Sequence, residues 1–350
     1  MKNADDGQYY FLEVNTVAQW KGLQSVSNVN IAQCIIDHLT SITTQTRKNN
    51  ITPSLIKDYY DKNLEYLPRE KQFHFCSRMH LMTNDTRYSE KLEQLKSWYT
   101  WDADKLQNSI NNILKNSTSY IAKITNNYDF RIECAAKYPL LGAYNQILYK
   151  TLFTKTIYGI DYRKHIANLL RNSDIGKYRK LLANDNSAIF ALSTHAINFI
   201  YLSSWLFDDT DSIDVTNLFT IAQNEKLENE SNTILSRIYL LTHSIICKSL
   251  FYSQEISQHK PIYINMLKEL EAIITTQYTT ISLDQKCEFL VCAKMLQYKT
   301  HLQETISNEI QSSLSPHGNY IVDVFNTYKS STKKDLTLSE HRNVLYLLSN

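Results

Sequence analysis

Apolar residues recur at helical spacing through most of the chain, with polar residues between them. Residues three, four and seven positions apart share one face of a helix, so this spacing predicts helices rather than strands. Asp185 and Ser231 are N-cap candidates before apolar runs, and Pro261 suits a first helical turn. The pattern predicts helices over residues 29–46, 53–65, 69–84, 88–99, 103–125, 130–154, 162–174, 186–206, 213–224, 231–252, 260–277, 283–297, 299–313 and 336–349.

Two kinds of helix alternate in the second half of the chain. Residues 260–277 carry a one-sided apolar stripe with Lys268 and Glu269 opposite, which is typical of an outer helix. Four other helices are apolar over much of their surface, which predicts that they are buried. These inner helices span 186–206, 231–252, 283–297 and 336–349, and we expect them side by side, with 213–224, 260–277 and 299–313 around them.

One polar residue occupies the same register in each inner helix: His195, His243, Glu288 and His341. The positions four and seven residues further on are apolar in every case, namely Phe199, Cys247, Cys292 and Leu345, then Leu202, Leu250, Met295 and Leu348. Each of these four anchors therefore occupies a position where the pattern expects a core side chain. We expect the anchors to face one cavity.

The anchors recur at intervals of about 50 residues, which is typical of helix-pair repeats. Alternating inner and outer helices with this period predict an all-α fold, either an α/α toroid or a strongly curved α-solenoid. We expect one helical-repeat domain over residues 1–350, less regular in 1–126 and regular in 127–350. Tyr144 or Asn145 could be a preceding anchor, whereas the neighbours of His74 do not match the register.

Composition narrows the class of protein. The chain is 43% apolar and holds only six Gly and five Pro, which favours a large helical core. A net charge of +2 without a concentrated basic face gives no indication of nucleic-acid binding. The N-terminus lacks the features of a signal peptide, and the most apolar stretch, 188–207, is too polar for a membrane span. Six Cys without a CxxC pair are typical of a reduced, cytoplasmic protein.

The anchors allow a metal site. Histidine nitrogen and carboxylate oxygen are the ligands of non-haem iron and zinc sites, and His195, His243, Glu288 and His341 supply that set. The chain has no short ligand pair such as HxH or HExxH. The structural alternative is that each histidine is a core residue hydrogen-bonded to a neighbour, which is the commoner role of an isolated part-buried histidine.

The anchors also allow acid–base chemistry without a metal. A carboxyl group among histidines in an apolar cavity has a shifted pKa, which suits Glu288 and His341 as catalytic residues. Asn198, Thr194 and Thr242 lie beside the anchors and are candidates for substrate binding. Tyr320 is a further candidate, because it lies in a long connection, 314–335, that precedes the His341 helix and could cover the cavity.

Short motifs in residues 185–350 resemble an uncharacterised family of bacterial all-helical proteins that is often found beside natural-product biosynthesis genes. The motifs are Ser193-Thr194-His195, Glu288 within 284–289, Ser315-Pro316-His317-Gly318, and Glu340-His341. The resemblance implies an α/α architecture and a role in specialised metabolism. The expected architecture also looks like that of lanthionine and terpene cyclases, but the Cys/Cys-His zinc set of the former is absent from this sequence.

The sequence thus predicts an enzyme of bacterial specialised metabolism that acts on a small molecule or peptide in a cavity lined by His and Glu. Iron or zinc is the candidate cofactor. The alternatives are a non-catalytic binding or self-resistance protein with the same cavity, and a scaffold that uses a concave helical surface for another protein. The oligomeric state is left open.

Overall fold

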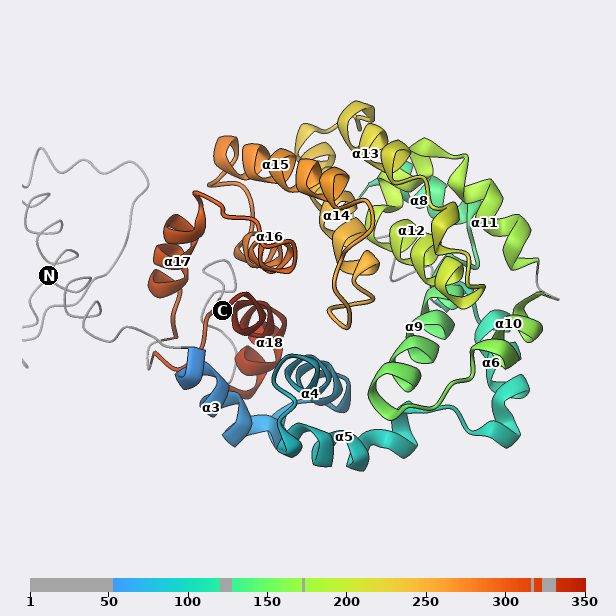
Figure 1. Cartoon of the computed structure of the whole chain (residues 1–350), viewed down its shortest axis with the longest axis horizontal. Coiled ribbons are helices and arrows are strands. Elements are labelled where there is room, and N and C mark those ends of the chain that lie inside the picture. Colours follow the sequence, from blue (N-terminus) through green and yellow to red (C-terminus); the bar gives the residue numbers. More distant parts are fainter. Residues whose placement is uncertain (1–52, 120–127, 172–173, 316–317, 323–331) are drawn as a thin grey trace, which may run out of the picture. The chain divides into compact units, whose positions relative to one another are not determined.

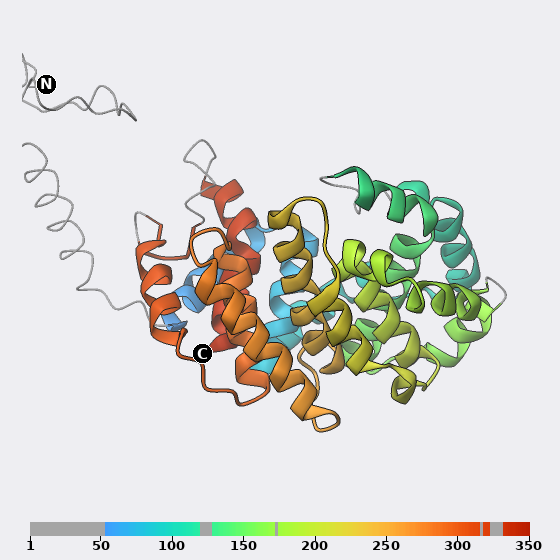
Figure 2. The ribbon, with the colours of Figure 1, turned by 90° about the horizontal axis from the view of Figure 1, so that it is seen from above.

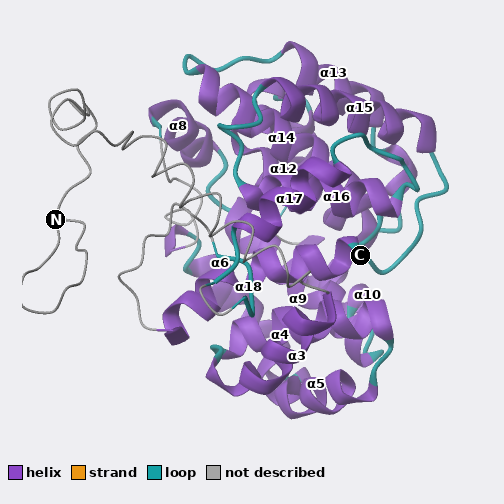
Figure 3. Ribbon diagram, turned by 90° about the vertical axis from the view of Figure 1, so that its left-hand side faces the viewer, coloured by secondary structure: helices purple, strands orange, loops and turns teal. Residues whose placement is uncertain are grey.

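The fold was analysed in a computed structural model, which describes residues 53–119, 128–171, 174–315, 318–322 and 332–350. The expected helix over 29–46 lies outside these residues. Within them the chain is all helical and has no strand (Figure 3). One isolated antiparallel bridge joins Leu314 to Ile321. The all-α class expected from the sequence is confirmed, and residues 51–350 form one compact unit.

The helices follow one another with short connections. The α-helices are α3 (Pro53–Asn63), α4 (Arg69–Thr83), α5 (Thr86–Tyr99), α6 (Leu106–Lys115), α8 (Asp129–Lys137), α9 (Leu141–Tyr158), α10 (Arg163–Arg171), α11 (Ile175–Ala183), α12 (Asn186–Leu206), α13 (Val215–Asn224), α14 (Glu230–Lys248), α15 (Lys260–Thr276), α16 (Leu283–Met295), α17 (Gln303–Ser312) and α18 (Thr332–Ser349). Three short 3-10 helices are η1 (Leu64–Tyr66), η2 (Ala103–Lys105) and η3 (Thr210–Ser212).

Side chains just before the helices fix where the inner helices begin. Asp185 accepts a hydrogen bond from the backbone N–H of Ala188 at the start of α12, as its N-cap position predicts. Asn229 caps α14 in place of the predicted Ser231, so α14 starts at Glu230, one residue earlier than predicted. Ser282 and Gln285 form a capping box at the start of α16, in which each side chain bonds the other residue's backbone.

Several of the predicted helix bounds are wrong. Residues 130–154 form two helices, because the backbone at Tyr138 leaves the helical region (φ −119°, ψ 63°) and α9 starts only at Leu141. Helix α11 was not predicted. The helix expected over 231–252 ends at Lys248.

The four predicted inner helices are consecutive neighbours in space. Helix α12 packs against α14, α14 against α16, and α16 against α18 (Figure 1). Helices α13, α15 and α17 pack against this row, as expected of outer helices. The row also continues into the first half of the chain, because α9 packs against α12 and α4 packs against α18 (Figures 1 and 2).

Helix α12 is the only helix of the described part that is long and apolar enough to cross a bilayer. Its most apolar window is 89% buried by the rest of the protein. A core helix has the same composition, so the length and hydropathy of α12 are accounted for by its central position among α9, α11 and α14.

Candidate functional site

The first anchor, His195, follows a kink in α12. Ser193 has φ 21° and ψ −92°, so the helix is interrupted two residues before the anchor. Asn145 of α9 donates its amide N–H to the backbone carbonyl of His195 (2.9 Å), and this hydrogen bond ties α12 to α9 at the anchor. Burial, with a further contribution from the charge of Arg131, lowers the pKa of His195 to about 4. His195 is therefore neutral at pH 7.

The second anchor, His243, is held by the amide of Asn198. The Asn198 Oδ1 atom lies 3.0 Å from His243 Nδ1 and also accepts the Cys247 thiol. Because a carbonyl oxygen only accepts, His243 carries its proton on Nδ1 and its Nε2 lone pair is free. Burial lowers the pKa of His243 to about 3, and the charges of His195 and His341 act in the same direction.

The free nitrogen of His243 faces Glu288. The distance from His243 Nε2 to Glu288 Oε1 is 3.8 Å, which is too long for a direct hydrogen bond. The other carboxyl oxygen of Glu288, Oε2, accepts the hydroxyl of Thr242 (3.0 Å). Burial raises the pKa of Glu288 to about 7; the Thr242 bond opposes this rise and the charge of Asp284 adds to it. Two basic atoms thus face one another across a gap, in surroundings that favour the neutral form of both groups.

The last anchor, His341, lies beside His74 of α4. The two rings are 5.4 Å apart between centroids, and burial lowers the pKa of His341 to about 4. Residue Glu340 is fully buried and binds His74 Nδ1 (2.7 Å) and Lys71 Nζ (3.0 Å). Burial alone would raise the pKa of Glu340, but His74 and Lys71 outweigh it and hold the pKa at about 2. This ion cluster joins the two ends of the described chain.

The described residues do not gather as metal ligands. No three side chains of His, Cys, Asp or Glu in this part of the chain lie close enough together to hold a metal ion. The polar atoms of Glu288 and His243 are instead partly engaged by Thr242 and Asn198. The iron or zinc hypothesis for the four anchors gains no support from this geometry.

A pocket of about 420 Å³ lies further along the same helix faces. Val291 and Met295 line it and are three and seven residues after Glu288; Arg78 is four residues after His74, and Leu348 seven after His341. Seven residues of helix span about 10 Å, so the pocket lies one to two turns beyond the anchors, towards the carboxyl ends of these helices. The rest of its lining is Met82, Tyr252, Ser253, Gln254, Glu255, Ile256, Lys260, Lys294 and Gln297.

The connection from α14 to α15 supplies part of this pocket. Leu250, Phe251 and Tyr252 all have left-handed backbone angles (φ 46°, 55° and 74°), which non-glycine residues adopt at a cost. Phe251 is buried against the rings of Tyr149 and Phe153 on α9. Tyr252 lines the pocket together with Arg78, and the charges of Glu288 and Arg78 act on the pKa of Tyr252 in opposite directions. The strained turn therefore places Tyr252 in the wall of the pocket, within electrostatic reach of Glu288.

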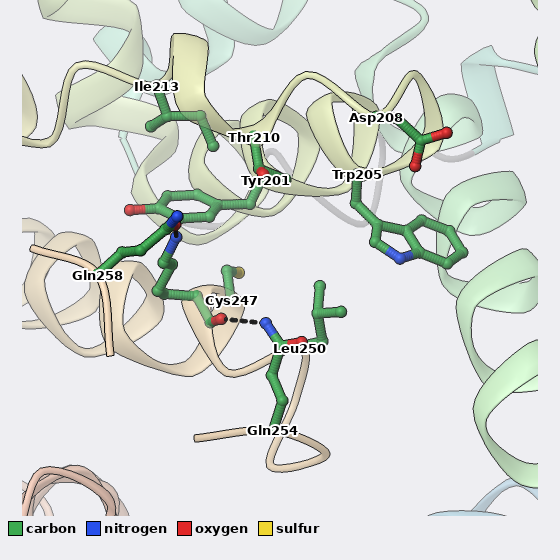
Figure 4. A pocket seen from close by; sticks show the side chains of 10 residues that line it. Tyr201, Trp205, Asp208, Thr210, Ile213, Cys247, Leu250, Gln254 and Gln258 are labelled. Carbon is green, nitrogen blue, oxygen red and sulfur yellow. Dashed lines mark hydrogen bonds between the residues drawn. The ribbon is translucent and has the colours of Figure 1, made fainter. Parts of the chain in front are cut away.

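A second pocket of about 330 Å³ lies at the carboxyl end of α12 (Figure 4). Tyr201, Trp205 and Cys247 line it, and Cys247 is also the thiol that donates to Asn198. Gln254 bonds the backbone carbonyl of Lys248 across its rim. This pocket reaches the Asn198 network through Cys247.

Comparison with known proteins gives one match. A family described as a domain of unknown function, DUF3541, matches residues 49–349. The chain belongs to this family. The matched region covers the compact unit over 51–350 almost completely, and so includes α3 to α9 as well as the part, 185–350, on which the sequence resemblance rested. Searches of curated proteins and of solved structures find no significant match.

Within this DUF3541 domain the predicted substrate-binding residues have different surroundings. Asn198 and Thr242 are buried and orient His243 and Glu288. Thr194 is part-buried next to the kink at Ser193. Tyr320 is buried and stacks on Tyr59 of α3 (centroids 5.4 Å apart), on the side of α18 that carries Asn343 rather than His341.

The connection expected to cover the cavity is only partly described. Ile321 exchanges hydrogen bonds with the Asn343 side chain through its N–H (2.8 Å) and its carbonyl (3.0 Å). The described part, 318–322, is thus fixed against α18, while 316–317 and 323–331 lie outside the described residues.

Sequence reasoning missed three residues near the site: His74, Arg78 and Tyr252. His74 and Arg78 lie on α4, whose neighbours do not match the repeat register, although their spacing of four residues on one helix was a usable signal. Tyr252 was assigned to a helix that ends four residues earlier.

Proposed function

We propose that this chain is an enzyme that moves a proton on a small molecule held among its inner helices. The observation that carries the proposal is the pair formed by His243 Nε2 and Glu288 Oε1, which face one another at 3.8 Å. A substrate O–H or N–H group beside this pair would donate to His243, while Glu288 takes a proton from a neighbouring substrate atom and returns it to another.

The protonation states favour Glu288 as the proton-transfer group. Its pKa of about 7 lies near neutral pH, where a carboxyl group can both accept and donate a proton. The pKa of His243, about 3, keeps the imidazole neutral, so it serves as a hydrogen-bond acceptor that orients the substrate. His195 and His341 are neutral as well, and are proposed to line the site as polar contacts.

We also propose that the inner helices close into an α/α toroid. Support comes from the order of contacts, which runs from α9 through α12, α14, α16 and α18 to α4. Helix α5 contacts both α4 and α9, so the series has a link between its two ends. In such a toroid the anchors and the pocket would share the axis.

The volume of the pocket, about 420 Å³, suits a small molecule better than a peptide. The place in bacterial specialised metabolism rests on the sequence resemblance and stays a prediction. A non-catalytic binding protein would use the same cavity, and the test below separates it from an enzyme.

The test compares the wild type with Glu288→Gln on a pool of small molecules from a bacterial extract, followed by mass spectrometry. We expect some compounds to be consumed and isomeric or related products to appear with the wild type but not with Glu288→Gln. Glu304→Gln is the matched control, because Glu304 is an exposed carboxylate on α17. Identical product profiles for wild type and Glu288→Gln would refute the proposal; compounds that co-purify unchanged with both would favour the binding protein.

A further inference from the structure

The guanidinium of Arg78 lines the 420 Å³ pocket and has no carboxylate partner among the described residues. Its Nη1 donates to Ser77 Oγ (2.9 Å), and its guanidinium lies over the ring of Phe153 at 4.7 Å from the centroid. No ion pair joins Arg78 to an acidic residue of the described chain, and its buried Nε has no hydrogen-bond partner there. A part-buried guanidinium in this condition retains the capacity to bind an anion.

The free edge of the guanidinium fits a carboxylate. Ser77 engages Nη1 and Nε is buried, so a ligand meets the guanidinium at Nη2, and a turn of the side chain towards the ligand brings Nε on the same edge into contact. Two parallel N–H groups on one edge match the two oxygens of a carboxylate, which is the usual bidentate arrangement.

The remaining lining of the pocket has the same preference. Lys260 and Lys294 also line it, against the single carboxylate of Glu255. The apolar part of the lining comes from Met82, Ile256, Val291, Met295 and Leu348. A ligand with one anionic group and an apolar body matches both the excess of cations and the apolar wall.

We propose that this pocket binds a small organic carboxylate, with the carboxylate group on Arg78 and the apolar body against Val291 and Met295. Val291 and Met295 follow Glu288 by three and seven residues on α16, so a ligand held in this way extends from the pocket towards Glu288. As a substrate site the pocket rests on the proposed function, whereas carboxylate binding by itself does not require any reaction.

The test is calorimetric titration of the full chain with phenylacetate and octanoate, each beside its neutral amide. We expect both carboxylates to bind the wild type and both amides to bind at least about tenfold more weakly. Arg78→Met keeps the length of the side chain and removes the charge, and we expect it to weaken carboxylate binding by about ten- to a hundredfold. Arg87→Met, which alters an exposed guanidinium on α5, is the matched control and should bind like the wild type.

Two further variants keep the result interpretable. Met295→Trp fills the apolar side of the pocket without altering Arg78, so it should also weaken binding and decides the matter if Arg78→Met does not fold. Glu288→Gln should bind the carboxylates at least as well as the wild type, because it removes a nearby acidic group. This variant separates the two proposals. If carboxylates bind but the wild type and Glu288→Gln give identical product profiles, the proposed enzymatic function is refuted and the proposed carboxylate site is not.

The proposal is overturned if neither carboxylate binds the wild type, if the amides bind equally well, or if the folded Arg78→Met or Met295→Trp variant binds as tightly as the wild type.

Discussion

Replacing Glu288 by Gln should make the protein more stable at alkaline pH. Burial raises the pKa of Glu288 from the ordinary 4.5 to about 7. Between these two pH values the unfolded chain releases the proton and the folded chain keeps it, so folding stability falls as pH rises from about 4.5 to about 7. Above pH 7 the loss is complete.

The size of the effect follows from the pKa difference. At 1.36 kcal/mol for each pKa unit, the rise from 4.5 to about 7 corresponds to about 3 kcal/mol. Glutamine cannot ionise, and its carbonyl can still accept the Thr242 hydroxyl that Glu288 accepts at 3.0 Å. Glu288→Gln should therefore match the wild type near pH 4.5 and exceed its free energy of unfolding by about 3 kcal/mol at pH 8.

Urea unfolding at pH 5, 6, 7 and 8 measures this difference, with Glu304→Gln as the control that makes the same chemical change on the exposed face of α17. The wild type and the control should lose stability over this range more steeply than Glu288→Gln. Parallel pH profiles, or a Glu288→Gln variant that is less stable than the wild type at pH 8, would show that Glu288 is ionised at little cost in the folded protein. The proton-transfer role would then lose its physical basis.

Three other substitutions test the surroundings of the site. Glu340→Gln should lower the free energy of unfolding at pH 7 by about 2–3 kcal/mol in urea unfolding, because the low pKa of Glu340, about 2, stabilises the fold. This stabilisation is present above pH 4.5 and is lost as the pH falls towards 2. Lys71→Met should cost less stability, since the Lys71 side chain is 34% exposed. Asn198→Leu removes the acceptor of the Nδ1 proton, so the nitrogen NMR shifts of His243 should change from one tautomer to a mixture, and an unchanged spectrum contradicts the assignment. Leu250→Gly should have a higher thermal midpoint than Leu250→Ala, because both lose the same part-buried side chain and only glycine adopts φ 46° without strain; a lower midpoint for Leu250→Gly contradicts a strained turn.

Periodicity alone predicted that these segments are helices, but it separates an inner from an outer helix only for α12, which is apolar over most of its surface and buried. Helices α14, α16 and α18 are no more apolar than α15, so their inner position follows from their contacts with one another. The meeting of His243 with Glu288 was also accessible, because residues at one register of neighbouring parallel helices lie at the same height. Capping residues such as Ser282 fixed the starts of the helices locally.

Contacts between distant parts of the chain were not accessible. His74 and Glu340 are 266 positions apart, and no local pattern indicates that α4 packs against α18. The kink at Ser193 and the left-handed turn at 250–252 were missed for a related reason. Ser, Leu, Phe and Tyr have no intrinsic preference for these backbone angles, so tertiary contacts such as that of Phe251 with Tyr149 must hold them.

The charges along the inner faces give a bound carboxylate a direction. Glu288 repels an anion once it is ionised, whereas Arg78, which lines the pocket, attracts one. A carboxylate substrate would therefore place its charged group at Arg78 and its uncharged end beside Glu288 and His243, where the proton-transfer atoms lie. An apolar core in these positions would be more stable, because it would hold no neutral Glu and no unpaired Arg. A ligand that extends from the pocket to the anchors and needs both groups would account for the neutral Glu288 and the unpaired Arg78 together.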